Sequence, residues 1–87
     1  MTTSIGDAKG AVLAANTEGE QAVASVQAVI TSLERQRAAL MAAAHGTCQA
    51  DAEHAARAIT AVIEHFHEGI RMSAQASQHV QDVAGRL

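Results

Sequence analysis

Side chains that bind metal ions or act as nucleophiles gather near the middle of this chain. His45, Cys48, Asp51 and His54 recur every three residues. Structural zinc sites usually draw on C-x-x-C or H-x-x-x-H spacings, and neither spacing occurs here. His45 and His54 would also face opposite sides of a helix, because that separation turns through about half a circle. We therefore expect neither a zinc site nor a Cys–His–Asp nucleophile. Cys48 is interpreted as a small apolar filler or, in a symmetric dimer, an intermolecular bridge.

A second candidate for chemistry is the pair Glu64 and His67, which lie three residues apart. Residues at this spacing share a helix face, and paired Glu-x-x-His motifs line di-iron helical bundles. The pair supports an alternative function as a metal-binding, ferritin-like two-helix protein. Di-iron ligands project inward, however, whereas both residues fall outside the apolar seam described below. We predict a protein that is not an enzyme and has no cofactor, with these residues on a solvated face.

The composition indicates one small helical domain over residues 1–87. The chain has 21 alanines, no proline and a single aromatic residue. Alanine is the best helix former and proline the worst, so a nearly all-helical chain is favoured. Small scaffolds usually need disulfides, a metal or oligomerisation for stability, and one cysteine cannot form an internal disulfide. Association with a second chain is therefore the leading expectation.

With a net charge of −3, the chain is expected to bind neither nucleic acid nor a membrane. The chain has no basic stripe and no aromatic stacking platform, so we expect no nucleic-acid binding. No apolar run approaches the ~20 residues that span a bilayer, so we expect no membrane insertion. The segment MTTSIGDAKG lacks the basic start and apolar stretch of a secretory signal. The expected location is the cytoplasm, or outside the cell after export without a cleaved signal peptide.

Apolar residues repeat every seven positions in both halves of the chain, and the two series mirror each other about Gly46. The series are Ile5, Val12, Gly19, Val26, Leu33, Leu40 and Ala52, Ile59, Phe66, Ser73, Val80, Leu87. A chain folded back at Gly46 brings the two series together. The pattern predicts an all-α antiparallel two-helix hairpin with a heptad seam. One continuous coiled coil is the alternative, but the repeat is out of phase across Gly46.

Capping residues give the expected bounds of the two helices. Ser4 or Thr3 caps a first helix over about 5–44, with Asp7 in its first turn. The turn is 45–47, where Gly46 takes the left-handed conformation after His45. Thr47 is the expected cap of a second helix over about 48–85.

The repeat also indicates which side chains pack. We expect the seam to contain Val26, Leu33, Ile59, Phe66 and Val80. The expected apolar stripe also includes residues three positions further on, such as Ala15, Val29 and Val62, and residues four positions further on, such as Val23, Ile30 and Ile63. We expect contacts to a partner chain from residues at or beside the seam: Val23, Ile30, Ile63, Phe66 and Ile70.

Gly19 and Ser73 face each other across the seam in this register, where large apolar residues would be expected. Glycine removes side-chain bulk at a cost in helix stability. The pair indicates a loosely packed middle, a close approach of the helices, or a notch that admits a partner's side chain.

Two helices of near-equal length around Ala44-His45-Gly46-Thr47, rich in small residues, resemble the WXG100 family, the small ESX-type proteins of type VII secretion. The resemblance is architectural and covers most of the chain. It implies homodimers or heterodimers that form four-helix bundles and are exported as folded units. The family's Trp-x-Gly turn is replaced by His45-Gly46, and its tyrosine-based export motif is absent because the chain has no tyrosine. His79-Val80-Gln81-Asp82 has the wrong spacing for that motif.

These observations favour a non-enzymatic protein–protein interaction module. The expected assembly is a homodimer, or a heterodimer with another helical protein, that forms a four-helix bundle. The expected role is that of an ESX-like, type VII secretion-associated protein or an accessory of a larger secreted partner. A coiled-coil adaptor with no role in secretion is the remaining alternative.

Overall fold

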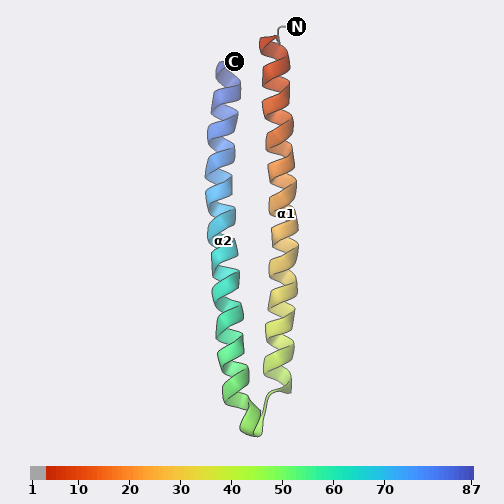
Figure 1. Cartoon of the computed structure of the whole chain (residues 1–87), viewed down its shortest axis with the longest axis vertical. Coiled ribbons are helices and arrows are strands. Elements are labelled where there is room, and N and C mark those ends of the chain that lie inside the picture. Colours follow the sequence, from red (N-terminus) through yellow and green to blue (C-terminus); the bar gives the residue numbers. More distant parts are fainter. Residues whose placement is uncertain (1–3) are drawn as a thin grey trace.

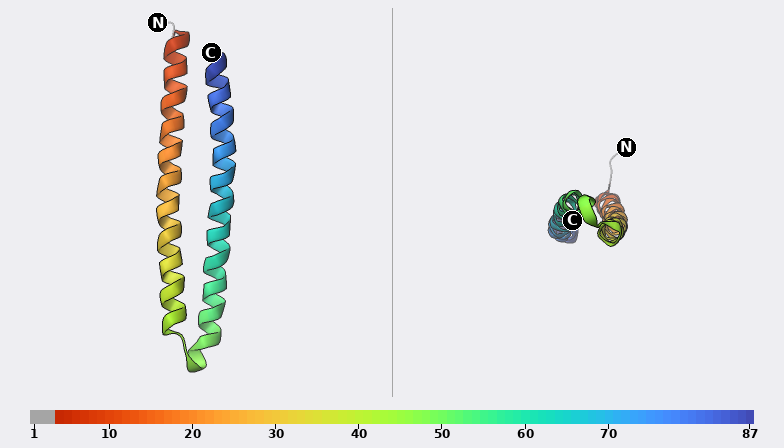
Figure 2. Two further views of the ribbon diagram at one scale, coloured as in Figure 1. Left: turned by 180° about the vertical axis from the view of Figure 1, so that it is seen from behind. Right: turned by 90° about the horizontal axis from the view of Figure 1, so that it is seen from below.

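The chain folds as a long antiparallel helical hairpin (Figure 1). The structure is a computed structural model and describes residues 4–87. Helix α1 spans Ile5–Ala43 and helix α2 spans Gln49–Arg86, with a short 3₁₀ turn, η1, at Gly46–Cys48. The rod measures 69 × 17 × 17 Å. The start of α1 and the end of α2 lie together at the end of the rod away from the turn (Figure 2). The predicted all-α hairpin is confirmed.

Ser4 sets the start of α1. Its backbone is extended, and its Oγ accepts a hydrogen bond from the Asp7 amide at 3.0 Å. This bond satisfies one of the amides that have no partner inside the helix. Asp7 lies in the first turn, where a carboxylate is favoured by the helix dipole. The predicted cap is therefore confirmed for Ser4, while Thr3 lies outside the described residues.

The turn depends on Gly46, whose φ of +64° lies in the left-handed region that glycine adopts without strain. The ring Nδ1 of His45 lies 2.8 Å from the carbonyl oxygen of Ala43, at the end of α1. The prediction that Thr47 caps the second helix is wrong. Thr47 lies inside η1, and the residue before α2 is Cys48, which makes no side-chain capping bond. Backbone bonding replaces the cap, because the Gln49 amide donates to the Gly46 carbonyl.

The seam between the helices contains the predicted residues. Val26, Leu33, Ile59, Phe66 and Val80 are all half-buried. The most buried side chains complete the seam, and they are Ile30, Ala52, Ala56, Ile63 and Ala84. Three of these five are alanines, so the buried core is thin.

Of the two rows expected beside the first, only the row three positions on departs from the prediction. Val29, Val62 and Val83, three positions after the first row, remain exposed at 45%, 43% and 50%. The seam instead uses the row four positions on, which contains Val23, Ile30, Ile63 and Ile70. The row three positions on and the row four positions on both lie next to the first seam row on the surface of a helix. The row four positions on has the larger side chains, and apolar stabilisation grows with the area removed from water.

A polar connection also joins the helices. Arg37 donates from Nη1 to Thr60 Oγ1 at 2.8 Å, and Thr60 Oγ1 donates to the Ala56 carbonyl at 3.0 Å. Both side chains are half-buried. Among residues 4–87 this is the one side-chain hydrogen bond that crosses from α1 to α2. It helps to fix the register of the two helices near the turn.

Candidate interaction surface

The hairpin has two broad faces, one on each side of the seam, and they differ in chemistry. On a helix, the residues one and three positions after a seam residue point to opposite sides of the seam. Because the helices are antiparallel, the matching rows of α1 and α2 lie on the same face of the rod. We call one the alanine–valine face, made of Ala8, Ala15, Ala22, Val29, Gln36, Ala43, Cys48, Ala55, Val62, Gly69, Ala76 and Val83. We call the other the polar face, made of Leu13, Glu20, Gln27, Glu34, Met41, Glu53, Thr60, His67, Ala74 and Gln81.

Two grooves near the turn confirm that these rows share faces. One groove is lined by Ala43 of α1 together with Cys48 and Ala55, all members of the alanine–valine face. The other is lined by Glu34 of α1 and Glu53 of α2, both from the polar face. The faces are therefore continuous surfaces that cross from one helix to the other.

The alanine–valine face is apolar, and all of its residues except the half-buried Ala8 and Ala55 are exposed to solvent. Within its twelve positions the only polar side chains are Gln36 and Cys48. Its outer border on α2 adds Met72, whose side chain is 60% exposed. The polar face also has two exposed apolar residues, Leu13 and Met41, but these are isolated among carboxylates and amides. A contiguous apolar surface of this length is characteristic of interaction sites.

The exposed area of the molecule is large for its mass. The chain exposes 6364 Å², whereas a compact protein of its mass, 9.0 kDa, exposes about 4,900 Å². In a rod that is only two helices wide, each helix covers one side of the other, and the remaining sides are exposed to solvent. Specific interfaces bury about 800 Å² on each partner. One face of this rod is long enough to supply that area.

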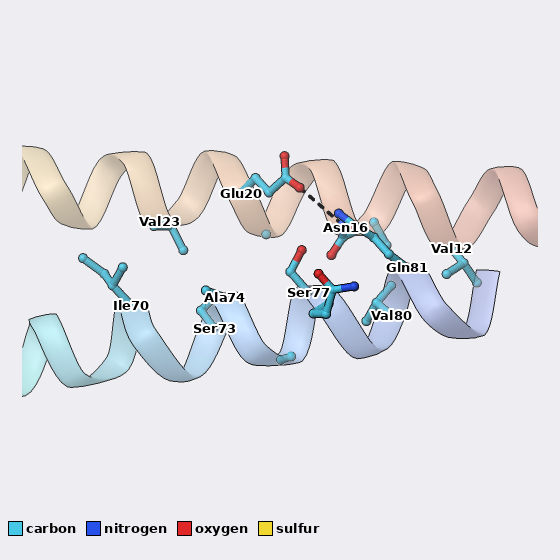
Figure 3. Close-up of a pocket in the computed structure, with 14 residues that line it drawn as sticks. Val12, Asn16, Glu20, Val23, Ile70, Ser73, Ala74, Ser77, Val80 and Gln81 are labelled. Atoms are coloured by element: carbon cyan, nitrogen blue, oxygen red, sulfur yellow. Dashed lines mark hydrogen bonds between the residues drawn. The ribbon is translucent and has the colours of Figure 1, made fainter. Parts of the chain in front are cut away.

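A groove interrupts the seam in the half of the rod near the termini (Figure 3). Val23 and Ile70 close one end of it, and Val12 and Val80 close the other. Small and polar residues line the space between, namely Ala15, Asn16, Gly19, Glu20, Ser73, Ala74, Ala76, Ser77, Gln78 and Gln81. Asn16 donates from Nδ2 to Glu20 Oε1 at 3.3 Å along its rim.

Gly19 is not a site of close helix approach. A Cβ atom placed on Gly19 would meet nothing within 4 Å outside its own helix backbone. Of the three interpretations of Gly19 and Ser73, a close approach is therefore excluded. The pair instead contributes to an open groove where a larger residue would fill the seam.

The candidate metal ligands are placed on the outside of the rod. Glu64 and His67 are exposed, as are His45, Cys48, Asp51 and His54. Across residues 4–87, no three His, Cys, Asp or Glu side chains come together as metal ligands would.

The ion pair found in residues 4–87 lies within a single helix. Glu68 and Arg71 form an exposed ion pair on α2, and hydrogen bonding to Glu68 raises the pKa of Arg71. An exposed pair of this kind contributes little to stability.

The side chains predicted to contact a partner lie in the seam between the two helices. Ile30 and Ile63 are only 4% and 6% exposed. Val23, Phe66 and Ile70 are half-buried. Because the other helix of the same chain already covers much of these side chains, Ile30 and Ile63 leave almost no surface for a partner. The free apolar surface belongs to the neighbouring row, which sequence reasoning placed inside the seam.

Comparison of the chain with protein-family models, curated proteins and solved structures gives no match. Over the described residues, neither helix is both long and apolar enough to cross a membrane.

Proposed function

We propose that this protein is a non-enzymatic interaction module that pairs with a second helical hairpin to form a four-helix bundle. The observation that carries the proposal is the alanine–valine face, where Val29, Val62 and Val83 are exposed in rows that, apart from Gln36, are otherwise made of small residues. Small residues allow the helices of a partner to approach closely, and the valines supply apolar area to the contact. The partner is a copy of this chain or another helical protein.

The cellular role that we propose is that of an ESX-like, type VII secretion-associated protein or an accessory of a larger secreted partner. The support is architectural: near-equal helices, a glycine turn and an apolar face on one side of the hairpin. Export in the native host should then stop when the type VII secretion ATPase is deleted. Export that continued without the ATPase, or a protein found only inside the cell, would favour the coiled-coil adaptor instead.

The pairing surface is tested by two substitutions two residues apart. Ala22 lies on the alanine–valine face, whereas Ala24 points away from both the face and the seam, and both are exposed. Each also lies four residues after a glutamate, Glu18 or Glu20, so an added aspartate meets similar repulsion within the helix.

Ala22→Asp should weaken pairing at least about tenfold, because an unpaired carboxylate would be removed from water at the contact. Ala24→Asp should leave pairing unchanged. Sedimentation equilibrium measures the pairing of each variant, and circular dichroism verifies that both remain helical. Equal behaviour of the two variants would show that the alanine–valine face is not the pairing surface.

A further inference from the structure

The groove that interrupts the seam between Val12 and Val23 has the size of a small-molecule site (Figure 3). We call it the seam groove. Its volume is about 690 Å³, and small-molecule sites in proteins usually measure about 300–1,000 Å³. The helical rise from Val12 to Val23 is about 16 Å, at about 1.5 Å per residue. Valine and isoleucine side chains close both ends, so the groove fits an elongated molecule with an apolar body.

Polar side chains occupy seam positions inside the groove, where the seam elsewhere has large apolar residues. Asn16 and Ser77 are half-buried and lie in the same rows as the buried Ile30 and Ile63. The one side-chain hydrogen bond that crosses between the helices in residues 4–87 lies elsewhere, near the turn. Asn16 and Ser77 therefore face each other across the groove without bonding to each other (Figure 3).

The hydroxyl groups of the seam groove also differ from others on the two helices. Several helix hydroxyls bond back to a carbonyl one turn earlier. Those of Ser73 and Ser77 make no such bond within residues 4–87, although both residues are half-buried. Each hydroxyl can both donate and accept a hydrogen bond. Two half-buried polar groups are thus available to a molecule that enters the groove.

The seam groove has one charged lining residue, Glu20. Asn16 donates from Nδ2 to Glu20 Oε1 at 3.3 Å and so helps to hold the carboxylate at the rim (Figure 3). The ion pair formed in residues 4–87 is on α2 and does not involve Glu20. A carboxylate with no cation beside it in the groove is complementary to a positively charged ligand.

We propose that the seam groove binds an elongated amphipathic amine. The apolar body of the amine lies over Gly19 and Ser73, where burial of apolar surface favours binding. Its ammonium group lies at Glu20 and donates its remaining hydrogen bonds to Asn16 Oδ1 and Ser77 Oγ. Glu20 belongs to the polar face, so this site is separate from the alanine–valine face and does not require a second chain.

Three probes of equal chain length test the preference for a cation. Decylamine, decanol and decanoate share an apolar chain and carry a positive, a neutral and a negative end. Isothermal titration calorimetry is performed below their micelle-forming concentrations. Decylamine should bind at least about tenfold more tightly than the other two, because only its end group is attracted to Glu20. Equal binding of the three would overturn the cation as the ligand, and binding of none would overturn the site.

A pair of glycine substitutions tests whether the amine occupies the seam groove. Gly19 lines the groove, whereas Gly10 lies on the same helix outside it. A Cβ atom at either position meets nothing within 4 Å beyond the helix's own backbone, so both positions accept a leucine. Gly19→Leu should abolish decylamine binding because its side chain fills the groove, and Gly10→Leu should leave binding unchanged. Circular dichroism verifies that both variants remain helical. Equal binding by the two variants would show that the amine lies elsewhere.

A pair of glutamate substitutions tests the role of the carboxylate. Glu20→Gln removes the charge but keeps an oxygen that can accept from Asn16, and it should weaken decylamine binding about tenfold without affecting decanol. Glu18→Gln makes the same change in net charge outside the groove and should have no comparable effect. An equal loss in both variants would show that net charge, and not the seam groove, attracts the amine.

Discussion

At the residue scale, the hairpin depends on a few large apolar side chains in a seam that is otherwise small. Ile63 and Val62 are neighbours in sequence, yet one is buried in the seam and the other is exposed on the alanine–valine face. Their environments differ because a helix turns through about 100° per residue. Adjacent positions therefore lie in different environments, one inside the hairpin and one on its surface.

Ile63→Ala should lower the free energy of unfolding by about 2–4 kcal/mol, because it removes buried methyl groups and leaves a cavity. Glu64→Ala, at the next position on an exposed surface, should change it by less than about 0.5 kcal/mol. Chemical denaturation at fixed protein concentration measures both. Equal effects of the two substitutions would show that the seam is not where we place it.

At the element scale, the effect of a glycine depends on whether it lies in the middle of a helix or in the turn between two helices. Gly19 and Gly46 illustrate the difference, since one lies in mid-helix with open space around it and the other adopts a positive φ. Substitution by alanine should therefore have opposite effects at the two positions.

Gly19→Ala should stabilise the protein by about 1 kcal/mol, because alanine is the better helix former. Gly46→Ala should destabilise it by about 1–2 kcal/mol, because an alanine is strained in the left-handed region. Thermal unfolding followed by circular dichroism measures both changes. A destabilising Gly19→Ala would contradict the open groove that surrounds this residue.

The contact between helices can be tested through Arg37 and Thr60. Their hydrogen bond should contribute about 0.5–1.5 kcal/mol of coupling free energy. The coupling is obtained from a double-mutant cycle of Arg37→Ala and Thr60→Val. Additive effects of the two substitutions would indicate that the bond does not fix the helix register in solution.

The sequence was sufficient to predict the elements but not the second row of the seam. The glycine turn, the Ser4 cap and the first seam row follow from local propensity and a seven-residue period. Two rows lie beside the first seam row, one three positions and one four positions further along the chain. Which of them is buried depends on how the two helices pack against each other, because the contact area between them is limited. Val29 and Val62 are apolar, so their residue type does not show that they lie outside the seam. Only the packing of their neighbours Ile30 and Ile63 inside the seam shows it. Thr47 was misassigned because backbone bonding in η1 took the place of its side chain.

At the scale of the whole molecule, the isolated hairpin is a narrow rod with one apolar face exposed. Among residues 4–87, three of the five buried side chains are alanines, so little apolar area is removed from water within one chain. Pairing through the alanine–valine face would bury a second seam and supply the missing stability.

Leu33→Asp tests how the seam and the assembly depend on each other. An unpaired carboxylate in the seam should abolish helical folding, and with it any pairing, because the alanine–valine face requires both helices. Circular dichroism and sedimentation velocity on the same sample give both readouts. Full helicity and an unchanged assembly in Leu33→Asp would show that the seam is placed in the wrong register.

Native mass spectrometry of the untagged, unmodified protein measures the pairing of two hairpins most directly. We expect a metal-free species at twice the 9.0 kDa chain mass. A stable helical monomer at the same concentration, or a higher oligomer that carries iron or zinc, would contradict it.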